Sequence, residues 1–326
     1  MSVVRAIQIE RTGGPEVMKL ADIPIGEPGP GEVRIRHHAI GLNFIDCYHR
    51  SGLYPIPLPA VLGTEGAGVI EAVGADVTHL VVGDRVAYTS RGPGSYAEAR
   101  VVAAAPVVKL PDSIDFAAGA AMMLKGLTVQ YLLRRTHVSL APGDMIVWHA
   151  AAGGVGLIAC QWARALGLRM IATAGSPEKC ALALAHGAAH AINYRTEDVV
   201  ARVRELTDGK RVKVVYDSVG KDTWERSLDC LQPLGLMVSF GNASGAVPPV
   251  SLGQLAAKGS LYVQRPTLHW YLTSAEVTQQ MANELFAQVA AGMTIGALRR
   301  YPLDQAAQAH RDMESRTTTG AGILVP

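Results

Sequence analysis

The hydrophobic and polar residues in the first third of the chain alternate with the period of a β-strand. The alternation is clearest over residues 3–9 and 33–39, and further short apolar runs lie within residues 62–74 and 82–88. Successive side chains of a strand point to opposite faces, so these segments are predicted to be strands. Clusters of glycine and proline, such as residues 26–32, separate them. Short strands with glycine corners are typical of a compact, barrel-like β domain.

The pattern changes to a longer period after Asp115. Residues 116–133 are rich in alanine, leucine and methionine and contain no proline, which predicts a helix. From Asp144 onwards, short apolar runs alternate with helix-like segments. The predicted strands are residues 145–148, 169–173, 191–194, 212–216 and 236–240, and the predicted helices are residues 155–166, 177–186, 196–206 and 223–232. This alternation predicts an α/β fold with a doubly wound parallel sheet of the Rossmann type.

The last part of the chain returns to shorter elements. From about Arg265 we expect short strands, two helices over residues 274–291 and 304–314, and a final strand in the closing run GILVP. We therefore predict that residues 1–124 and 266–326 together form the β-rich domain. The Rossmann domain, residues 125–265, is inserted between them.

Composition narrows the class of protein. The 326 residues, 49% of them apolar, suffice for two domains with separate cores. The formal charge of +2, without a lysine or arginine run, argues against a nucleic-acid partner. Four scattered cysteines without a C-x-x-C pair argue against a disulfide scaffold and fit a reducing compartment. No segment resembles a signal peptide or approaches a membrane span, so we expect a cytoplasmic protein without a membrane partner.

The segment HAAAGGVG, from His149 to Gly156, lies between a predicted strand and a predicted helix. In a dinucleotide-binding G-x-G-x-x-G turn, glycines allow a tight corner, close approach to the pyrophosphate and close helix packing. Gly153 and Gly156 supply the second and third glycine, Gly154 adds freedom, and Ala151 replaces the first. The following helix points unpaired N–H groups at the turn, which suits a diphosphate. Such a loop could serve only as a link, but the strand and helix around it favour dinucleotide binding.

The end of the next predicted strand indicates which dinucleotide binds. Folds that prefer NAD place a carboxylate about 20 residues further on, where it binds the ribose hydroxyls. Here that position holds Gly175, so no carboxylate repels a 2′-phosphate. Ser176 offers a hydroxyl, Lys179 a positive charge, and Tyr194 could close the pocket. Lys179 taken alone would be read as a solvated helix residue, but the missing carboxylate favours NADPH.

Two segments resemble the medium-chain dehydrogenase/reductase superfamily: GLNFIDCYHRSGLYP, from Gly41, and GTEGAGVIEAVG, from Gly63. In the zinc alcohol dehydrogenases of this superfamily, these segments and a cysteine ahead of the inter-domain helix supply the ligands of the catalytic zinc. The corresponding residues here are Asn43, Thr64 and Leu124. None of them offers a thiolate or an imidazole, so we predict no metal at this site.

Further strings resemble the zinc-independent NADPH:quinone oxidoreductases, which are related to the lens zeta-crystallins. They are NFIDCYHRSGLYP, LKGLTVQYLL, HAAAGGVGLIACQWA, VYDSVG and WERSLDCL, and the likeness runs essentially from end to end. The resemblance implies a GroES-like catalytic domain beside the Rossmann domain, NADPH as cofactor and a homodimer. Members of this family commonly pair by extending the sheet of the nucleotide domain. Residues 261–264 could form that edge, or they could be an internal strand.

The resemblance also implies roles for individual residues. Around the nicotinamide half of NADPH it places Asn43, Tyr48, Lys125 and Thr128, and at the pyrophosphate Gly153, Gly154 and Val155. At the 2′-phosphate it places Ser176, Lys179 and Tyr194, at the next two strand ends Ser218, Phe240, Gly241 and Asn242, and on the far side Arg265 and Arg316. Ligands of open α/β sheets lie outside the carboxyl ends of the strands, which agrees with the strand-end members of this set.

The missing zinc ligands bear on the reaction. Without a metal, a simple ketone would need a strong substitute acid, whereas a quinone is reduced to a delocalised anion and needs less help. We therefore predict an enzyme that reduces small quinones with NADPH, in which Asn43, Tyr48 and Tyr54 hydrogen-bond the substrate oxygens and Asp46 caps a helix. Two alternatives stay open: reduction of enone or alkenal double bonds, and NADPH binding with little catalysis. The residues do not distinguish hydride transfer from single-electron transfer.

Overall fold

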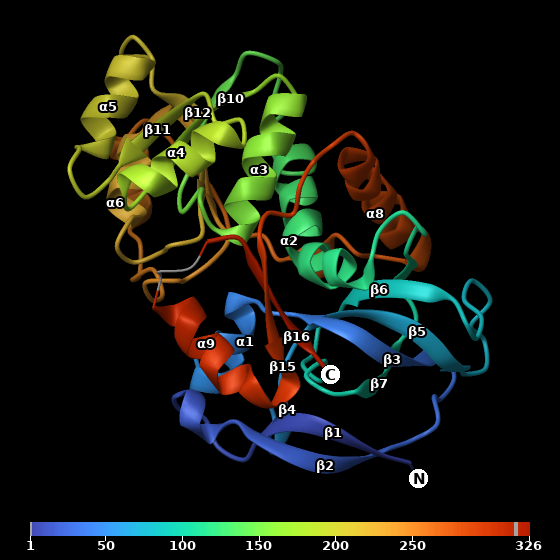
Figure 1. The fold of residues 1–326 in the computed structure, drawn as a ribbon. Helices are drawn as coiled ribbons and strands as arrows, with labels where there is room; N and C mark the ends of the chain where they lie inside the picture. The colour runs from blue at the N-terminus through green and yellow to red at the C-terminus, as the bar shows by residue number, and fades with distance from the viewer. Residues whose placement is uncertain (1, 316–318) are drawn as a thin grey trace. The chain divides into compact units, whose positions relative to one another are not determined.

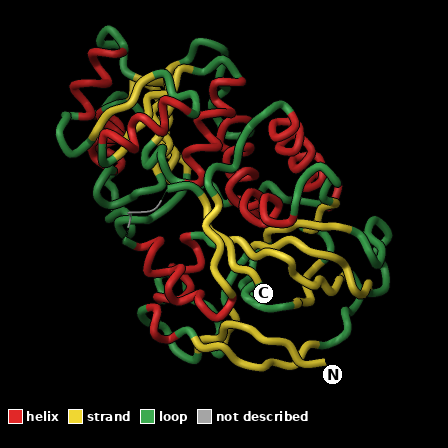
Figure 2. Tube along the Cα trace, in the orientation of Figure 1, coloured by secondary structure: helices red, strands yellow, loops and turns green. Residues whose placement is uncertain are grey.

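The computed structural model describes residues 2–315 and 319–326 (Figures 1 and 2). Within these residues the chain forms two compact units. Unit 1 consists of residues 1–127, 271–291 and 295–326, and unit 2 of residues 128–270 and 292–294. Unit 1 is thus assembled from both ends of the chain. The predicted fold class, a β-rich domain with a Rossmann sheet inserted into it, is confirmed.

Unit 2 is built around a parallel sheet whose strands follow the order β11-β10-β9-β12-β13-β14. This is the 3-2-1-4-5-6 order of a Rossmann fold, in which the order reverses beside the first strand. The strands are β9 (Met145–Trp148), β10 (Arg169–Ala174), β11 (His190–Asn193), β12 (Val212–Asp217), β13 (Leu231–Ser239) and β14 (Tyr262–Gln264). The helices are α3 (Gly154–Ala165), α4 (Pro177–Ala185), α5 (Val199–Leu206), α6 (Trp224–Asp229) and α7 (Leu252–Ala257).

Continuous apolar runs form the central strands of this sheet because both of its faces are covered by other elements. Val147 of β9, Ile171 of β10 and Val215 of β12 belong to one core cluster and are fully buried. The same runs end abruptly in small or polar residues. The sequence thereby fixes where each strand stops and where a loop with binding groups can begin.

Three boundaries in unit 2 differ from the sequence prediction by more than one residue. Helix α5 begins at Val199 instead of residue 196, because the Asp198 carboxylate caps its first N–H groups. Helix α6 ends at Asp229 and β13 begins at Leu231, although the prediction extended the helix to residue 232 and began the strand at residue 236. Leu231 pairs with Val212 before the register shifts, so pairing with β12 decides the structure of this segment.

Unit 1 contains two sheets, one with the strand order β2-β1-β4 and one with the order β15-β16-β3-β5-β6-β8, in which β7 also pairs with β3. The strands of the first third are β1 (Ser2–Ile9), β2 (Lys19–Ile25), β3 (Glu32–Gly41), β4 (Ala60–Val61), β5 (Glu65–Val73), β6 (Arg85–Thr89), β7 (Ala99–Ala103) and β8 (Val107–Lys109). The last strands are β15 (Leu298–Pro302) and β16 (Ala321–Val325). Because β16 pairs with β3, the end of the chain completes a sheet that the first third begins (Figure 1).

The helices of unit 1 are α1 (Phe44–Ser51), α8 (Ala275–Ala290) and α9 (Ala306–Glu314), and α2 (Phe116–Arg134) begins in this unit. Short 3₁₀ turns of unit 1 lie at Pro15–Val17 and Leu303–Gln305, and another, Leu268–Trp270, lies at the end of the long segment of unit 2. The predicted helix over residues 304–314 is therefore divided into a 3₁₀ turn and α9. Helix α1 is only eight residues long and ends at Gly52, which has a φ of 84°. A segment this short gives no clear periodicity, so the sequence did not delimit it.

Helix α2 corrects one expectation from the sequence. Its 19 residues, with a mean hydropathy of 1.3 in the most apolar window, would be long and apolar enough to cross a membrane, and it is the one such helix in the described part of the chain. The statement that no apolar run approaches this length is therefore wrong. However, 83% of that window is buried inside the structure, as in the core helix of a globular fold. Its apolar composition is explained by burial.

Candidate active site and cofactor cradle

The glycine-rich turn connects β9 to α3. Ala150 has a φ of 54°, a left-handed conformation that non-glycine residues rarely adopt. The Gly153 N–H donates to the Ala150 carbonyl at 3.0 Å, which closes the turn. Gly153 is also the N-cap of α3, so no side chain caps the N–H groups of the first helical residues, Gly154 and Val155. These donors and the positive end of the helix dipole make the turn a site for an anion.

The surroundings of Gly156 explain why the third position of the motif holds a glycine. A Cβ built on Gly156 would lie 2.4 Å from the carbonyl oxygen of Ala151 and 2.5 Å from its Cα. A Cβ on Gly153 would meet only the Ala150 oxygen, at 3.3 Å. Helix α3 thus packs directly on the backbone of the turn, and the space before Gly153 stays open for a ligand. The turn fits a dinucleotide diphosphate, although Ala151 replaces the first glycine.

A buried chain of hydrogen bonds lies behind this turn. His149 Nδ1 lies 2.8 Å from Thr173 Oγ1, and His149 Nε2 lies 2.9 Å from Ser227 Oγ. Ser227 in turn donates to Asp217 Oδ2 at 2.8 Å. Because the hydroxyl proton of Ser227 goes to the carboxylate, Ser227 accepts from Nε2–H, and Nδ1 accepts from Thr173. Burial lowers the pKa of His149, which fits this neutral tautomer.

Sequence reasoning missed this chain. Its members come from the ends of β9, β10 and β12 and from α6. The available signal was that His149 and Asp217 each stand at the end of an apolar run, where ligands and polar networks gather in such sheets. These hydrogen bonds join the ends of three strands next to the glycine-rich turn, so they fix the positions of the strand ends relative to one another.

The residues predicted for the 2′-phosphate lie together after β10 and β11. A Cβ on Gly175 would lie 2.6 Å from the Tyr194 hydroxyl, so glycine leaves room for the ring to approach this strand end. Ser176 is the N-cap of α4, and its hydroxyl accepts from the Lys179 N–H at 3.3 Å. The same Cβ position lies 3.5 Å from Arg195 Nε. Sequence reasoning passed over this guanidinium, although it directly follows Tyr194.

The remaining residues predicted in unit 2 fall at further strand ends. Ser218 follows β12, and Phe240, Gly241 and Asn242 follow β13. A Cβ on Gly241 would lie 2.6 Å from the Ser218 carbonyl oxygen, so these two loops touch. Thr128 is buried on α2, and Arg265 is exposed after β14. The predicted Arg316 lies outside the described residues.

Asn43 is the centre of a buried polar group in unit 1. Its amide nitrogen donates to Glu65 Oε2 at 2.7 Å, and its amide oxygen accepts from Lys125 Nζ at 2.7 Å. Glu65 also accepts from the Leu124 N–H at 2.7 Å, and burial raises its pKa. A Cβ on Gly41 would lie 2.2 Å from Glu65 Oε2, so glycine at the end of β3 makes space for the carboxylate.

The three positions that correspond to zinc ligands lie within this group. Asn43 binds Glu65, the chain neighbour of Thr64, and Leu124 donates its N–H to the same carboxylate. Amide, hydroxyl and alkyl groups in these places do not match the thiolate and imidazole donors that zinc prefers. Throughout residues 2–315 and 319–326, no cluster of three or more histidine, cysteine or acidic residues could hold a metal ion. The residues therefore do not fit a zinc site.

Asp46 connects α1 to the interior of unit 1. It accepts from the Asn43 N–H at 2.9 Å, which caps α1 as predicted, from the Tyr96 hydroxyl at 2.9 Å and from Thr64 Oγ1 at 3.3 Å. Tyr96 also lies 3.0 Å from His310 Nε2. Burial raises the pKa of Asp46 to about 7.

The directions of these hydrogen bonds follow from Arg50. Its guanidinium can only donate, so His310 Nδ1, at 2.9 Å, accepts. The proton of His310 is therefore on Nε2 and is donated to Tyr96, whose own proton goes to Asp46. Burial and the nearby Arg50 lower the pKa of His310 to about 3, so this histidine stays neutral. This series of hydrogen bonds links α9 to the start of α1. Sequence reasoning missed it because its members are distant in sequence.

The two predicted tyrosines lie next to each other on and after α1. The ring centroids of Tyr48 and Tyr54 are 5.1 Å apart in an edge-on arrangement, and the Tyr54 N–H donates to the Tyr48 carbonyl at 3.1 Å. Both side chains are half-buried. The packing holds them as one rigid aromatic pair on the same segment as Asn43.

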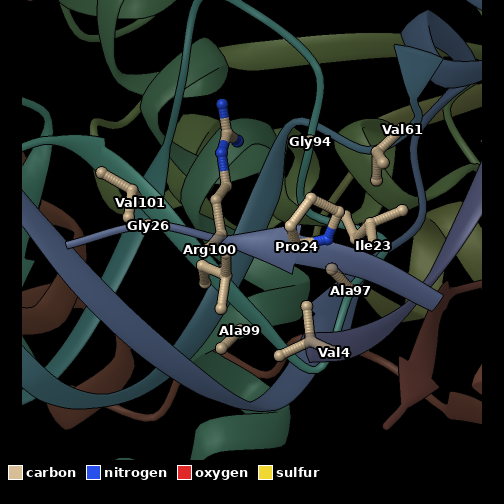
Figure 3. A pocket seen from close by; sticks show the side chains of 11 residues that line it. Val4, Ile23, Pro24, Gly26, Val61, Gly94, Ala97, Ala99, Arg100 and Val101 are labelled. Atoms are coloured by element: carbon tan, nitrogen blue, oxygen red, sulfur yellow. The ribbon is translucent and has the colours of Figure 1, made fainter. Parts of the chain in front are cut away.

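Two hollows in unit 1 contain none of the predicted site residues. One, of about 250 Å³, is lined mainly by apolar side chains of β1, β2 and β7 (Figure 3). The side chain of Arg100 extends away from these apolar groups and donates to Ser90 Oγ at 2.8 Å and Ser95 Oγ at 3.0 Å. The other, of about 540 Å³, lies between Ile114 and Phe286. Both linings are mainly apolar, with Arg100 as the polar side chain named in the first and Ser113 in the second.

Comparison with known proteins identifies the family. Residues 29–112 match the family described as alcohol dehydrogenase GroES-like domain, and residues 154–284 match the family described as zinc-binding dehydrogenase. A quinone oxidoreductase of Pseudomonas aeruginosa is 57% identical over 326 residues, which cover 99% of this chain and 100% of the relative. The chain belongs to the quinone oxidoreductase family of the medium-chain dehydrogenases/reductases. The predicted membership is confirmed.

Two further relatives extend the comparison within the quinone oxidoreductase family. The crystal structure of the Escherichia coli quinone oxidoreductase complexed with NADPH is 51% identical, covers 99% of this chain and 100% of its own, and has a TM-score of 0.96. A 2-haloacrylate reductase from Burkholderia is 43% identical over 333 residues, which cover 99% of both chains. The name zinc-binding dehydrogenase thus describes a broad family, whereas the zinc-ligand positions of this chain hold Asn43, Thr64 and Leu124.

Proposed function

We propose that the protein is an NADPH-dependent quinone reductase that passes reducing equivalents from NADPH to small quinones without a metal ion. The observation that carries this proposal is the full-length similarity to quinone oxidoreductases, one of which binds NADPH at 51% identity. The uncapped start of α3 and the cationic surroundings of Gly175 support it. NADPH supplies two electrons and a proton from C4 of its nicotinamide ring.

Unit 2 is the proposed cofactor domain. Gly153, Gly154 and Val155 would hold the pyrophosphate: the N–H groups of Gly154 and Val155 at the start of α3 would bind it, and Gly153 would line the turn before them. Ser176, Lys179 and Tyr194 would bind the 2′-phosphate, with Arg195 as a further cation beside Gly175. The residues proposed along the rest of the cofactor are Ser218, Phe240, Gly241, Asn242, Arg265 and Arg316.

Unit 1 is the proposed substrate domain. Asn43, Tyr48, Lys125 and Thr128 would surround the nicotinamide half, with Thr128 the first residue of unit 2. Tyr48 and Tyr54 would orient the quinone, because their rings pack against each other on the segment that carries Asn43. Asn43 uses one amide N–H on Glu65 and its amide oxygen on Lys125, so its second amide N–H would hydrogen-bond the substrate oxygen.

The test is oxidation of NADPH, followed at 340 nm, with 1,4-benzoquinone and a panel of other small quinones. We expect turnover that a chelator leaves unchanged, and a clear preference for NADPH over NADH. Absence of turnover with every quinone, or loss of turnover on chelation, would contradict the proposal. NADPH binding without turnover would instead favour a protein that binds the cofactor with little catalysis.

A second candidate function is reduction of an activated carbon–carbon double bond. The specific observation that favours it is the 2-haloacrylate reductase, which is 43% identical along the full length. Such a substrate also forms a delocalised anion when it is reduced, so it places the same demand on the site. Comparing kcat/KM for 2-chloroacrylate, a cyclic enone and 1,4-benzoquinone distinguishes the two functions.

We also propose a cytoplasmic homodimer. Strand β14 is an edge of the sheet, since it pairs only with β13 among the described strands, and Tyr262 and Val263 are 48% and 41% exposed. Exposed apolar edge strands readily pair with a second chain. Free cysteines at positions 47, 160, 180 and 230 fit a reducing compartment. Sedimentation equilibrium should give twice the chain mass, and Val263→Pro should shift the mass to that of one chain.

A further inference from the structure

Lys125 is a buried ammonium group in the polar cluster of unit 1. Nζ donates to the Leu42 carbonyl oxygen at 3.0 Å and to Asn43 Oδ1 at 2.7 Å. An ammonium has three N–H groups, so one is not used by these two acceptors. Glu65 Oε2 lies 3.7 Å from Nζ, within reach of the charge but beyond hydrogen-bond length. The third N–H is therefore weakly held.

Stability alone does not explain the presence of these charges. The Glu65 side chain is 0% exposed and the Lys125 side chain 7% exposed, so both charges are removed from water. Apolar side chains of similar size often replace such a pair without loss of stability. Charged groups that are retained in a buried cluster are candidates for chemistry.

The cluster also orients Lys125. The Asn43 amide bridges Glu65 and Lys125, and the Leu124 N–H holds the other oxygen of Glu65. The charge at Nζ is therefore placed by three fixed neighbours, which is the preorganised arrangement that stabilises a developing anion most effectively. The Lys125 side chain keeps an exposed fraction of 7%, so it is not completely sealed from solvent as Glu65 is.

We propose that the Lys125 ammonium is a catalytic group that stabilises the reduced quinone oxygen and donates a proton to it. This inference rests on the proposed function. Transfer of a hydride to a quinone gives the hydroquinone monoanion. One N–H bond of Lys125 then breaks as an O–H bond forms, which yields neutral hydroquinone, and the lysine amine regains a proton from water. Glu65 and Asn43 are positioning residues for the ammonium.

The first test compares Lys125→Met with Lys109→Met. Lys109 lies in the same unit, its side chain is 53% exposed, and it pairs with Asp84, so its variant controls for loss of a lysine charge. Removing one preorganised donor typically costs about 100-fold in kcat. We expect a loss of this size for Lys125→Met with 1,4-benzoquinone, whereas the Kd for NADPH, measured by fluorescence without quinone, should rise by a much smaller factor, because Lys125 is only one of several residues proposed around the cofactor. Lys109→Met should match the wild type in both kcat and the Kd for NADPH.

A second variant covers the case in which Lys125→Met does not fold. That substitution leaves the Glu65 carboxylate buried without its counter-charge, which is destabilising. The double variant Lys125→Met, Glu65→Gln removes both charges and should fold. We expect the same loss of kcat in the double variant, because the loss follows from the missing ammonium.

A spectroscopic test needs no turnover. 4-Nitrophenol is a stable probe of the oxyanion, since only its ionised form absorbs near 400 nm. The protein saturated with NADP⁺ should bind the phenolate at least about tenfold more tightly than the phenol, and the Lys125→Met, Glu65→Gln variant should lose this preference.

Three results would overturn the proposal: a kcat within about threefold of wild type in the double variant, a wild-type protein that does not favour the phenolate, or an NADPH Kd that rises by the same factor as kcat/KM falls. The last would make Lys125 a residue that only binds the cofactor. In each case the wild type would still reduce quinones, so failure here differs from failure of the proposed function.

Discussion

Substitution of Gly156 by alanine should break the contact between α3 and the turn before it. The new Cβ would lie 2.4 Å from the Ala151 carbonyl oxygen and 2.5 Å from Ala151 Cα. These are backbone atoms, so they cannot rotate away as a side chain could. Overpacking of this kind costs about 3 kcal/mol at the upper end of its range. Alanine recovers about 1 kcal/mol through its higher helix propensity, which leaves a net loss of about 2 kcal/mol in the free energy of unfolding of unit 2.

Tryptophan fluorescence gives a direct assay for this loss. All four tryptophans of the chain, at positions 148, 162, 224 and 270, lie in unit 2, so urea unfolding followed by their emission reports on this unit alone. A loss of about 2 kcal/mol raises the unfolded fraction roughly 30-fold. NADPH affinity should fall as well, because the turn must move.

Gly253→Ala is the matched control for Gly156→Ala. Gly253 lies in α7, and its Cβ would meet only Ser251 Oγ, at 3.5 Å. This variant should be as stable as the wild type or up to about 1 kcal/mol more stable. If Gly156→Ala behaved like this control, the explanation for the third glycine of the turn would be wrong.

Three further predictions concern single residues. Asp46 has its pKa raised from 3.8 to about 7 in the folded protein, so its protonation stabilises the fold at low pH and this contribution is lost as the pH rises to about 7. Asp46→Asn should therefore flatten the decline in stability between pH 4 and 7 in urea unfolding followed by circular dichroism; an unchanged slope would contradict this. Ala150→Gly should raise the stability of unit 2 by about 0.5–1 kcal/mol, because Ala150 has a φ of 54°; lower stability would show that the turn is not strained. Gly175→Asp should weaken NADPH binding at least about tenfold and strengthen NADH binding, because a carboxylate repels the 2′-phosphate and its Cβ displaces Tyr194. Equal Kd ratios for the two cofactors before and after the change would refute it.

The sequence predicted the Rossmann sheet of unit 2 almost strand by strand. Its central strands are fully buried, and a run such as Met145–Trp148 has the same boundaries in the pattern and in the structure. Boundaries failed where a long-range effect decided the outcome. The segment from Leu231 pairs with β12, although its local sequence favoured a continued helix. Local propensity is a weak guide when a sheet offers pairing partners.

The candidate site was predictable only in part. Asn43 and Gly153 stood in recognisable motifs, so their neighbourhoods could be anticipated. The partners of Asn43 could not, because Glu65 and Lys125 reach it from 22 and 82 positions away in the chain. The same holds for His310, which joins the network of Asp46 from α9. Polar networks depend on tertiary packing, and periodicity carries no information about which distant residues it brings together.

The discontinuity of unit 1 has a consequence for biosynthesis. A ribosome makes β3 before unit 2, but it makes β16, which pairs with β3, only after the whole of unit 2. His310 and Arg50, which orient Tyr96 towards Asp46, likewise become available together only after unit 2 has been made. Unit 2 is contiguous except for residues 292–294. Every segment of unit 2 is therefore made before unit 1 can be completed, so unit 2 can fold first on the nascent chain.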